Sequence, residues 1–184
     1  LKIEIANGIV LTQGTGDTIK AKTINFANAT SELTVGAAAT ITGSLVADAD
    51  GAGVLDVNAD TTITGDVGAS ASLDLATVEM ANGIKLTVQG DEYHAVNTTL
   101  ANATSEINFT NTTGTTTVSG IIKGDSGGVG IVDIDGDILL KGVIGTNAVA
   151  DIQIAADKTA TFQGGTVAAT AITLQGTSDS STIV

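Results

Sequence analysis

The chain has 184 residues made mostly of small side chains, with 23 Gly, 30 Thr and only 2% aromatic residues. Hydrophobic residues make up 42% and charged residues 15%, which excludes a chain that is disordered throughout, because such chains combine low hydrophobicity with high charge. The formal net charge of −13 and the absence of Arg exclude nucleic acid as an expected partner, since a phosphate backbone repels an acidic surface.

Three features of the sequence bear on export and membranes. No apolar run approaches the ~18 residues of a membrane span, so we expect no membrane insertion by this segment. The lack of Cys excludes disulfides and is compatible with an exported bacterial chain. Residues 1–5 (LKIEI) alternate like a strand and do not resemble a signal peptide, so we expect the chain to begin inside a longer protein.

Three segments recur farther along the chain, each after about the same distance. The recurring pairs are IANGIVL at 5–11 with MANGIKL at 80–86, ANATSE at 27–32 and again at 101–106, and GAGVLDV at 51–57 with GVGIVDI at 128–134. A third copy begins near residues 152–155. We therefore expect one solenoid segment over 1–184 with repeat units at about 5–79, 80–153 and, in part, 154–184.

A shorter rhythm of an apolar residue, a polar residue and Gly runs within each unit. The glycines of this rhythm are Gly14, Gly43, Gly65, Gly90, Gly120, Gly142 and Gly164. A tight corner favours Gly, because it needs a positive φ or a missing Cβ. The intervals predict three turns in each long repeat, with about 22–30 residues in a turn.

The local patterns indicate strands. Residues 53–58, 61–64 and 131–135 alternate with period two and are rich in β-branched side chains, whereas only residues 74–80 are compatible with a short helical turn. We predict an all-β fold, a right-handed parallel β-helix (β-solenoid) of about seven turns. A sandwich or barrel, the alternative, does not explain the short spacing of the turns. The predicted inward side chains are Val54, Leu55 or Val57, Ile63, Val118, Val132, Ile134, Ile138 and Leu140.

The long repeats, Asn-Ala-Thr-Ser turns, Thr-Ile-Thr-Gly and Gly-Val-Leu-Asp-Val strands, no Cys and no Arg together resemble the passenger region of bacterial autotransporters. The chain is particularly similar to tandem-repeat outer-membrane proteins of the rickettsial surface-antigen type. The resemblance extends over the whole chain in the kind of sequence and in the length of the repeat, but it includes no catalytic motif. It implies an extracellular β-solenoid on a bacterial cell surface, with a role in adhesion or coat formation.

Two acidic triplets are the candidate metal ligands: Asp56, Asn58 and Asp60, and their repeat equivalents Asp133, Asp135 and Asp137. Neither triplet has the glycine and the bidentate Glu of an EF-hand. Alternate residues of a strand point the same way, so stacked triplets are candidates for holding Ca²⁺ between turns. The other interpretation is that these side chains are solvated and keep the surface soluble.

Two other motifs carry weaker signals. Residues 124–128 (GDSGG) spell the nucleophile motif of chymotrypsin-like proteases, but the repeat aligns them with the turn at 48–51, so a turn is the expected structure. Tyr93 and His94 are placed in an exposed loop, where contacts with partners usually lie. The Thr ladders are too unevenly spaced for an ice-binding lattice.

Enzymatic activity is not expected. A β-helical lyase needs Arg or Lys to neutralise uronates, and the chain has no Arg and seven scattered Lys. The expected function is a structural rod for adhesion or surface coating, with no cofactor apart from possible Ca²⁺. The alternative is a self-assembling filament or surface-layer subunit. The expected partners are further repeats or copies joined end to end, and a possible host-cell or cell-surface receptor.

Overall fold

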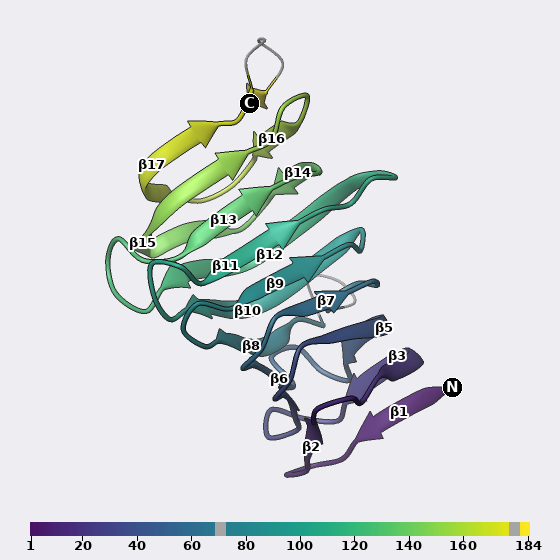
Figure 1. Ribbon diagram of the computed structural model, residues 1–184. Coiled ribbons are helices and arrows are strands. Elements are labelled where there is room, and N and C mark those ends of the chain that lie inside the picture. The colour runs from purple at the N-terminus through teal and green to yellow at the C-terminus, as the bar shows by residue number, and fades with distance from the viewer. Residues whose placement is uncertain (69–72, 177–180) are drawn as a thin grey trace.

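The computed structural model describes residues 1–68, 73–176 and 181–184, and in these residues it contains strands and no helix. The strands follow one another along the whole chain (Figure 1). They are β1 (Lys2–Ile5), β2 (Val10–Gln13), β3 (Ile19–Phe26), β4 (Glu32–Val35), β5 (Ala39–Ala47), β6 (Val54–Val57), β7 (Thr61–Ile63), β8 (Leu75–Met80), β9 (Lys85–Val88), β10 (Glu92–Leu100), β11 (Glu106–Phe109), β12 (Thr115–Gly124), β13 (Ile131–Ile134), β14 (Asp137–Leu140), β15 (Val143–Ile154), β16 (Thr159–Phe162), β17 (Val167–Leu174) and β18 (Thr182–Ile183).

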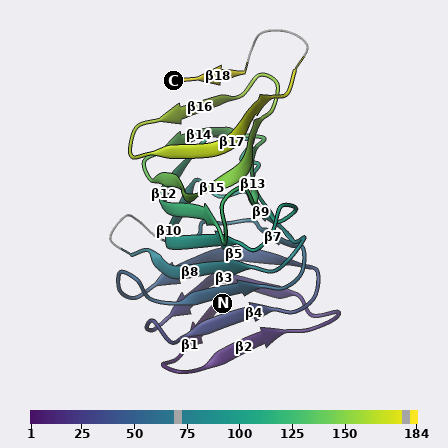
Figure 2. The same ribbon diagram turned by 90° about the vertical axis from the view of Figure 1, so that its left-hand side faces the viewer.

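All pairings between these strands are parallel, and the strands after the first turn stack on those of the turn before (Figure 2). Side 1 of the stack contains β1, the end of β3 and of β5, the start of β10 and of β12, and β14, β16 and β18. Side 2 contains β2, β4, β6, β8, the end of β10 and of β12, and the start of β15. Side 3 contains the start of β3 and of β5, then β7, β9, β11, β13 and the ends of β15 and β17. The predicted parallel β-helix is confirmed, with three sides to each turn.

The turns are more regular than the glycine intervals predicted. One inward column on side 3 runs through Ile19, Ile41, Ile63, Val88, Phe109, Ile134, Ile154 and Leu174. Its members correspond to about eight turns, where the sequence predicted about seven. Successive members are about 20–25 residues apart, within the range of solenoid repeats. At ~4.8 Å for each turn, the stack is about 38 Å long.

The longer glycine intervals arise because the seven glycines belong to different corners. A Cβ on Gly65 would meet Gly43, and a Cβ on Gly90 would meet Gly65, so these three form one column. Gly142 lies against Gly120 in a column at another corner. The step from Gly90 to Gly120 passes from one corner to the next, which explains why it is the longest interval of the series.

The core is a set of stacked aliphatic columns between the three sides. Of the predicted inward residues, Leu55, Val57, Ile63, Val118, Val132, Ile134, Ile138 and Leu140 are buried, whereas Val54 is half-buried and was predicted wrongly. Residues 75–80 form β8 and not the helical turn that seemed compatible with them. The rings of Tyr93 and Phe109 pack edge to face, with centroids 5.4 Å apart.

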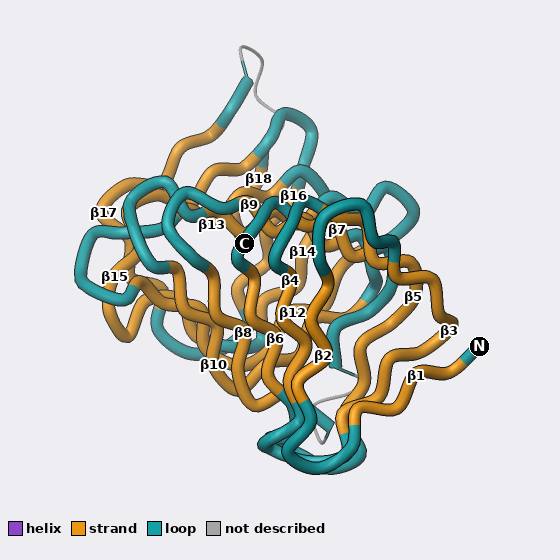
Figure 3. The backbone as a smooth tube through the Cα atoms, turned by 60° about the horizontal axis from the view of Figure 1, so that its bottom comes forward, coloured by secondary structure: helices purple, strands orange, loops and turns teal. Residues whose placement is uncertain are grey.

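The sequence repeat is longer than three turns by one side. Gln13, at the end of β2, is stacked under Val35, Val57 and then Met80, at the end of β8. The first IANG segment follows β1 on side 1, so its second copy, which follows β8, lies one corner farther around the stack. Ile154, where the third copy begins, is in the column of Val88, at the end of β9, and lies one corner farther again. Successive repeats therefore lie at three different corners of the stack, whose turns are seen from below in Figure 3.

Candidate functional site

The same hydrogen bond occurs at all three of these corners. Ser31 donates from Oγ to the carbonyl oxygen of Ala6, 3.0 Å away on the preceding turn. Ser105 donates to Ala81 over 2.9 Å, and Ser181 donates to the carbonyl oxygen of Ala155 over 2.9 Å. We call each such place a stacked corner: a lower turn (residues 6–9, 81–84 or 155–158) with the serine of the next turn above it.

The two motifs that recurred in the sequence are the two halves of one stacked corner. In the first copy the ANATSE segment lies directly above the IANG segment, and in the second copy the same segments meet again. The side chain of Asn28 accepts a hydrogen bond from the backbone nitrogen of Thr30, and Asn102 does the same for Thr104, each at 2.9 Å. These Asx turns shape the upper loop. The sequence contained a signal for this contact. The IANG and ANATSE motifs recur at nearly the same offset, and in each copy they lie about one turn apart along the chain.

The upper turn also holds the Asn-Gly bond of the lower turn. The nitrogen of Gly8 donates to Oγ1 of Thr30 at 3.0 Å, and that hydroxyl lies 2.9 Å from Oδ1 of Asn7. In the second copy the nitrogen of Gly83 is 3.2 Å from Oδ1 of Asn102 and 3.3 Å from Oγ of Ser105. Gly8 and Gly83 have φ of 68° and 71°, so Gly suits this position.

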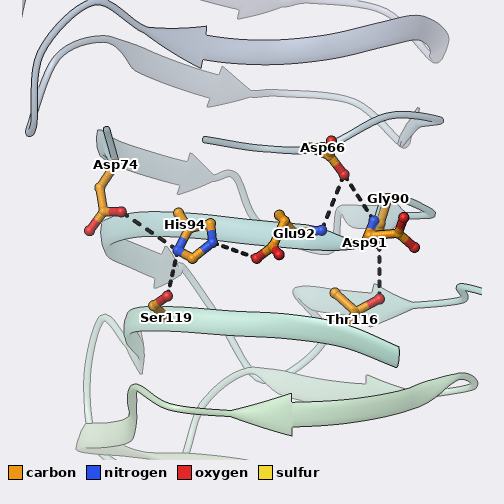
Figure 4. A network of polar contacts seen from close by, with 8 residues as sticks. All are labelled: Asp66, Asp74, Gly90, Asp91, Glu92, His94, Thr116 and Ser119. Atoms are coloured by element: carbon orange, nitrogen blue, oxygen red, sulfur yellow. Dashed lines mark hydrogen bonds and ion pairs between the residues drawn. The ribbon is translucent and has the colours of Figure 1, made fainter. Parts of the chain in front are cut away.

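A second polar network surrounds His94 (Figure 4). The prediction of an exposed loop at Tyr93 and His94 was wrong, because both lie in β10 and are buried. Tyr93 points into the core, where its hydroxyl is 2.6 Å from Oγ1 of Thr98 and burial raises its pKa. His94 points outward but is covered, with Nε2 2.6 Å from Glu92 and Nδ1 2.5 Å from Oγ of Ser119.

The order of these contacts is serine, imidazole and carboxylate. When Glu92 accepts the Nε2 proton, Nδ1 is free to accept the Ser119 hydroxyl, which is the relay of a nucleophilic serine with the two ring nitrogens exchanged. Asp74, from the preceding turn, lies 3.7 Å from Nδ1, and burial raises the pKa of its carboxyl. His94 is 3% exposed, and the network connects β10 with Asp74 of the preceding turn and Ser119 of the next turn.

Backbone groups beside this network are held in the same way. Oδ1 of Asp66 accepts hydrogen bonds from the nitrogens of Asp91 and Glu92, at 2.9 and 3.1 Å. Thr116 donates to the carbonyl oxygen of Gly90 over 2.9 Å (Figure 4). In contrast, Ser126 of the GDSGG motif lies in the turn after β12, as predicted, and is exposed.

The second acidic triplet is part of a cluster on the outer face of side 3. Asn108 of β11 donates from Nδ2 to Oδ2 of both Asp133 and Asp135, each at 2.9 Å. Lys85 of β9 pairs with Glu106 at 2.5 Å and lies 3.8 Å from Asp133. Asp133 is 8% exposed, and burial together with the charges of Asp135 and Glu106 raises its pKa to about 6. Lys85, Glu106 and Asn108 were missed because only the stacking of turns brings them to Asp133.

The remaining predicted ligands have separate partners. Asn58 donates to Asp56 over 2.7 Å, Asp60 accepts from the nitrogen of Lys85 at 2.9 Å, and Asp137 accepts from the nitrogen of Thr159 at 2.8 Å. In the described residues, no three His, Cys, Asp or Glu side chains form a group suited to a metal ion. Calcium binding by Asp56, Asn58, Asp60, Asp133, Asp135 and Asp137 therefore stays a prediction.

Both ends of the described stack expose core side chains. At the first turn, a pocket of about 300 Å³ is lined in part by the inward residues Ile3, Leu11 and Ile19. At the last turn, Ile172 and Leu174 are 49% and 50% exposed. The strand edges at both ends are unpaired among the described residues, which makes each end able to accept a further strand.

A comparison of the sequence with protein-family models, with curated proteins and with solved structures found no significant match. Among the described residues, no helix has the length and apolar character needed to cross a bilayer.

Proposed function

We propose that this chain is a non-catalytic structural rod of a bacterial cell surface, which contributes to adhesion or to a surface coat. The observation that carries the proposal is the arrangement of the stacked corners. The same corner, with the same serine-to-carbonyl bond, faces three directions at intervals of three turns and one side. Such a rod presents repeated surface groups all around its axis, which suits contacts with several neighbours at once.

The resemblance to autotransporter passenger regions supports the same function. The chain is strongly acidic, and the polar positions of the strands are mostly Thr, Asn, Asp and Gln. These side chains keep a stack of strands soluble, and they leave hydrogen-bonding groups on its surface that a partner can contact. A host-cell or cell-surface receptor is the partner that we propose for an adhesive role.

Immunogold labelling of the source bacterium tests this proposal. Antibodies raised against the purified chain are applied to intact and to permeabilised cells. We expect labelling of intact cells, at their surface. Labelling that requires permeabilisation would contradict a surface role. Adhesion is tested by binding of the purified chain to host cells, with an unrelated solenoid of similar charge as the control.

A self-assembling filament or surface layer is the second candidate, favoured by the two ends. Residues 1–26 carry three Lys and two acidic residues, whereas the rest of the chain carries four Lys and eighteen acidic residues. The first turns are thus much less acidic than the chain as a whole, and they expose apolar side chains that match the exposed Ile172 and Leu174 in kind. Joining end to end, by further turns of the same chain or of another copy, would cover both.

Electron microscopy of the purified chain separates the two candidates. Regular fibres or sheets would support the filament, and dispersed short rods would support the isolated structural rod. Leu174→Lys is the control variant, because a charge at an exposed strand edge opposes pairing with another edge. If fibres form, this variant should remain dispersed.

A further inference from the structure

The stacked corners contain the two Asn-Gly pairs of the chain, and such pairs are the sequences most prone to deamidation. Asn7-Gly8 and Asn82-Gly83 are Asn-Gly pairs in exposed turns. In such a pair the glycine nitrogen, after losing its proton to a base, can attack Cγ of the asparagine. The new N–C bond closes a five-membered succinimide and ammonia leaves from the side chain. Water then opens the ring to aspartate or to isoaspartate, in which the main chain runs through the former side chain.

This reaction needs a glycine nitrogen that is free to lose its proton. In both copies the nitrogen instead donates a hydrogen bond to the turn above: Gly8 to Oγ1 of Thr30 at 3.0 Å, and Gly83 to Asn102 and Ser105 at 3.2 and 3.3 Å. A proton held by an acceptor is harder to remove, because its loss leaves the acceptor oxygen facing a negative nitrogen.

In the first copy the side chain of Asn7, whose Cγ the glycine nitrogen would attack, is also restrained. The Thr30 hydroxyl lies 2.9 Å from Oδ1 of Asn7 and 2.9 Å from Oδ1 of Asn28, and shares its one proton between these two acceptors. The side chain of Asn82 has no hydrogen-bond partner among the described residues. The two copies therefore differ: Asn7 is held at both reacting groups, and Asn82 only through the glycine nitrogen.

We propose that the Asn-Ala-Thr-Ser turn protects the Asn-Gly bond of the turn beneath it from cyclisation to succinimide. Asn7 and Asn82 are thus the modification sites of this chain, and Thr30, together with Asn102 and Ser105, controls their rate. The third copy fits this assignment, because Ala156-Asp157 replaces the Asn-Gly pair there while Asp157 keeps a positive φ of 63°. That corner retains the serine bond but contains no Asn-Gly bond to protect.

The consequence of failed protection is specific to this fold. An isoaspartate adds one atom to the main chain of the corner, and the new carboxylate adds a charge to an acidic surface. Because Val10 follows shortly after and pairs with Glu32 of the next turn, the added atom would displace the register of side 2.

Peptide mapping by mass spectrometry, after incubation of the folded full-length chain in mildly alkaline buffer, tests the proposal. Thr30→Val removes the hydroxyl while keeping the shape of the side chain, and Thr30→Ser retains the hydroxyl. Thr30 is exposed, so both variants are expected to fold, which circular dichroism verifies. In Thr30→Val we expect isoaspartate at Asn7 to form several-fold faster, with the rate at Asn82 unchanged and Thr30→Ser close to the parent.

Two comparisons within the parent chain complete the experiment. Both sites should react more slowly when the chain is folded than in urea, and Asn82 should react faster than Asn7. An unchanged rate at Asn7 in Thr30→Val, or equal rates in the folded and the urea-unfolded parent, would overturn the proposal. A rise at Asn7 and Asn82 together in Thr30→Val would also overturn it, because this result indicates general loosening and not a local bond.

Discussion

Asn108 and Asp133 lie on neighbouring turns of side 3, and the side-chain nitrogen of Asn108 is 2.9 Å from Oδ2 of Asp133. The same nitrogen reaches Asp135 at 2.9 Å, so one amide serves two carboxylates. Glu106 and Lys85 face Asp133 from the two preceding turns, and Gln153 is stacked on it from the next turn. One cation thus faces three acidic groups, and a proton is the simplest way to reduce the repulsion.

The pKa of Asp133 predicts how stability depends on pH. In the folded chain this pKa is raised from 3.8 to about 6, so between these values the folded state binds more protons than the unfolded state. The contribution of Asp133 to the free energy of unfolding is therefore greatest below pH 3.8 and is lost as the pH rises to about 6. Asp133→Asn, which keeps an acceptor for Asn108, should raise the stability at pH 7 by about 2 kcal/mol and flatten this dependence.

Urea unfolding of the parent and of Asp133→Asn across this pH range measures the effect. The difference between the two chains isolates Asp133 from the other carboxyl groups. Asp125→Asn, in an exposed turn, is the matched control and should follow the parent at every pH. A constant difference between parent and Asp133→Asn would contradict the assignment.

The serine of the stacked corner should contribute to stability. Ser105 is fully buried and its hydroxyl donates to the carbonyl oxygen of Ala81. Ser105→Ala removes this donor and should lower the free energy of unfolding by about 1–2 kcal/mol. Ser126→Ala, in an exposed turn of the same chain, should change it by less than about 0.5 kcal/mol. Equal midpoints for the two variants in urea would show that the corner bond contributes nothing.

Glycine is required at some corners and not at others. Gly43 has a φ of 121°, and a Cβ there would overlap the carbonyl oxygen of Ala21 on the preceding turn. Gly43→Ala should therefore destabilise the chain by at least about 2 kcal/mol, because backbone must move at a position that L residues rarely adopt. A Cβ on Gly127 meets no atom within 4 Å, so Gly127→Ala should retain the parental melting temperature. The thermal unfolding of both variants checks this contrast.

Calcium binding by the two acidic triplets predicts a rise in the melting temperature, although several of their oxygens already have hydrogen-bond partners. Asp60 and Asp137 each accept a hydrogen bond from a backbone nitrogen of the next turn, and Asp56 accepts one from the side chain of Asn58. Because a ligand that binds the native state must raise its stability, a titration with millimolar Ca²⁺ followed by thermal unfolding is a direct test. A rise in the midpoint that Asp133→Asn or Asp56→Asn abolishes would support calcium binding by the triplets, and an unchanged midpoint would contradict it.

The sequence alone determined the fold class and the fact that the chain is built from repeating turns. Alternating β-branched residues define strands, Gly and Asn define corners, and internal offsets reveal that turns repeat, since all three depend on local backbone preference and period. The alternation of apolar and polar residues was enough to predict that Leu55, Val57 and Ile63 are buried. The same local reasoning placed Val54 wrongly, because period two does not say which of the two faces of a strand points inward.

Only the tertiary structure decided which turn lies on which. Neither the length of a corner nor its direction is fixed by local preference, so the sequence did not show that the repeat exceeds three turns by one side or that Gly90 and Gly120 occupy different corners. The same reason hid the contacts of His94 with Ser119 and of Asp133 with Lys85, which join residues of different turns. Stacking sets these contacts, and stacking follows from how each whole turn closes around the aliphatic core.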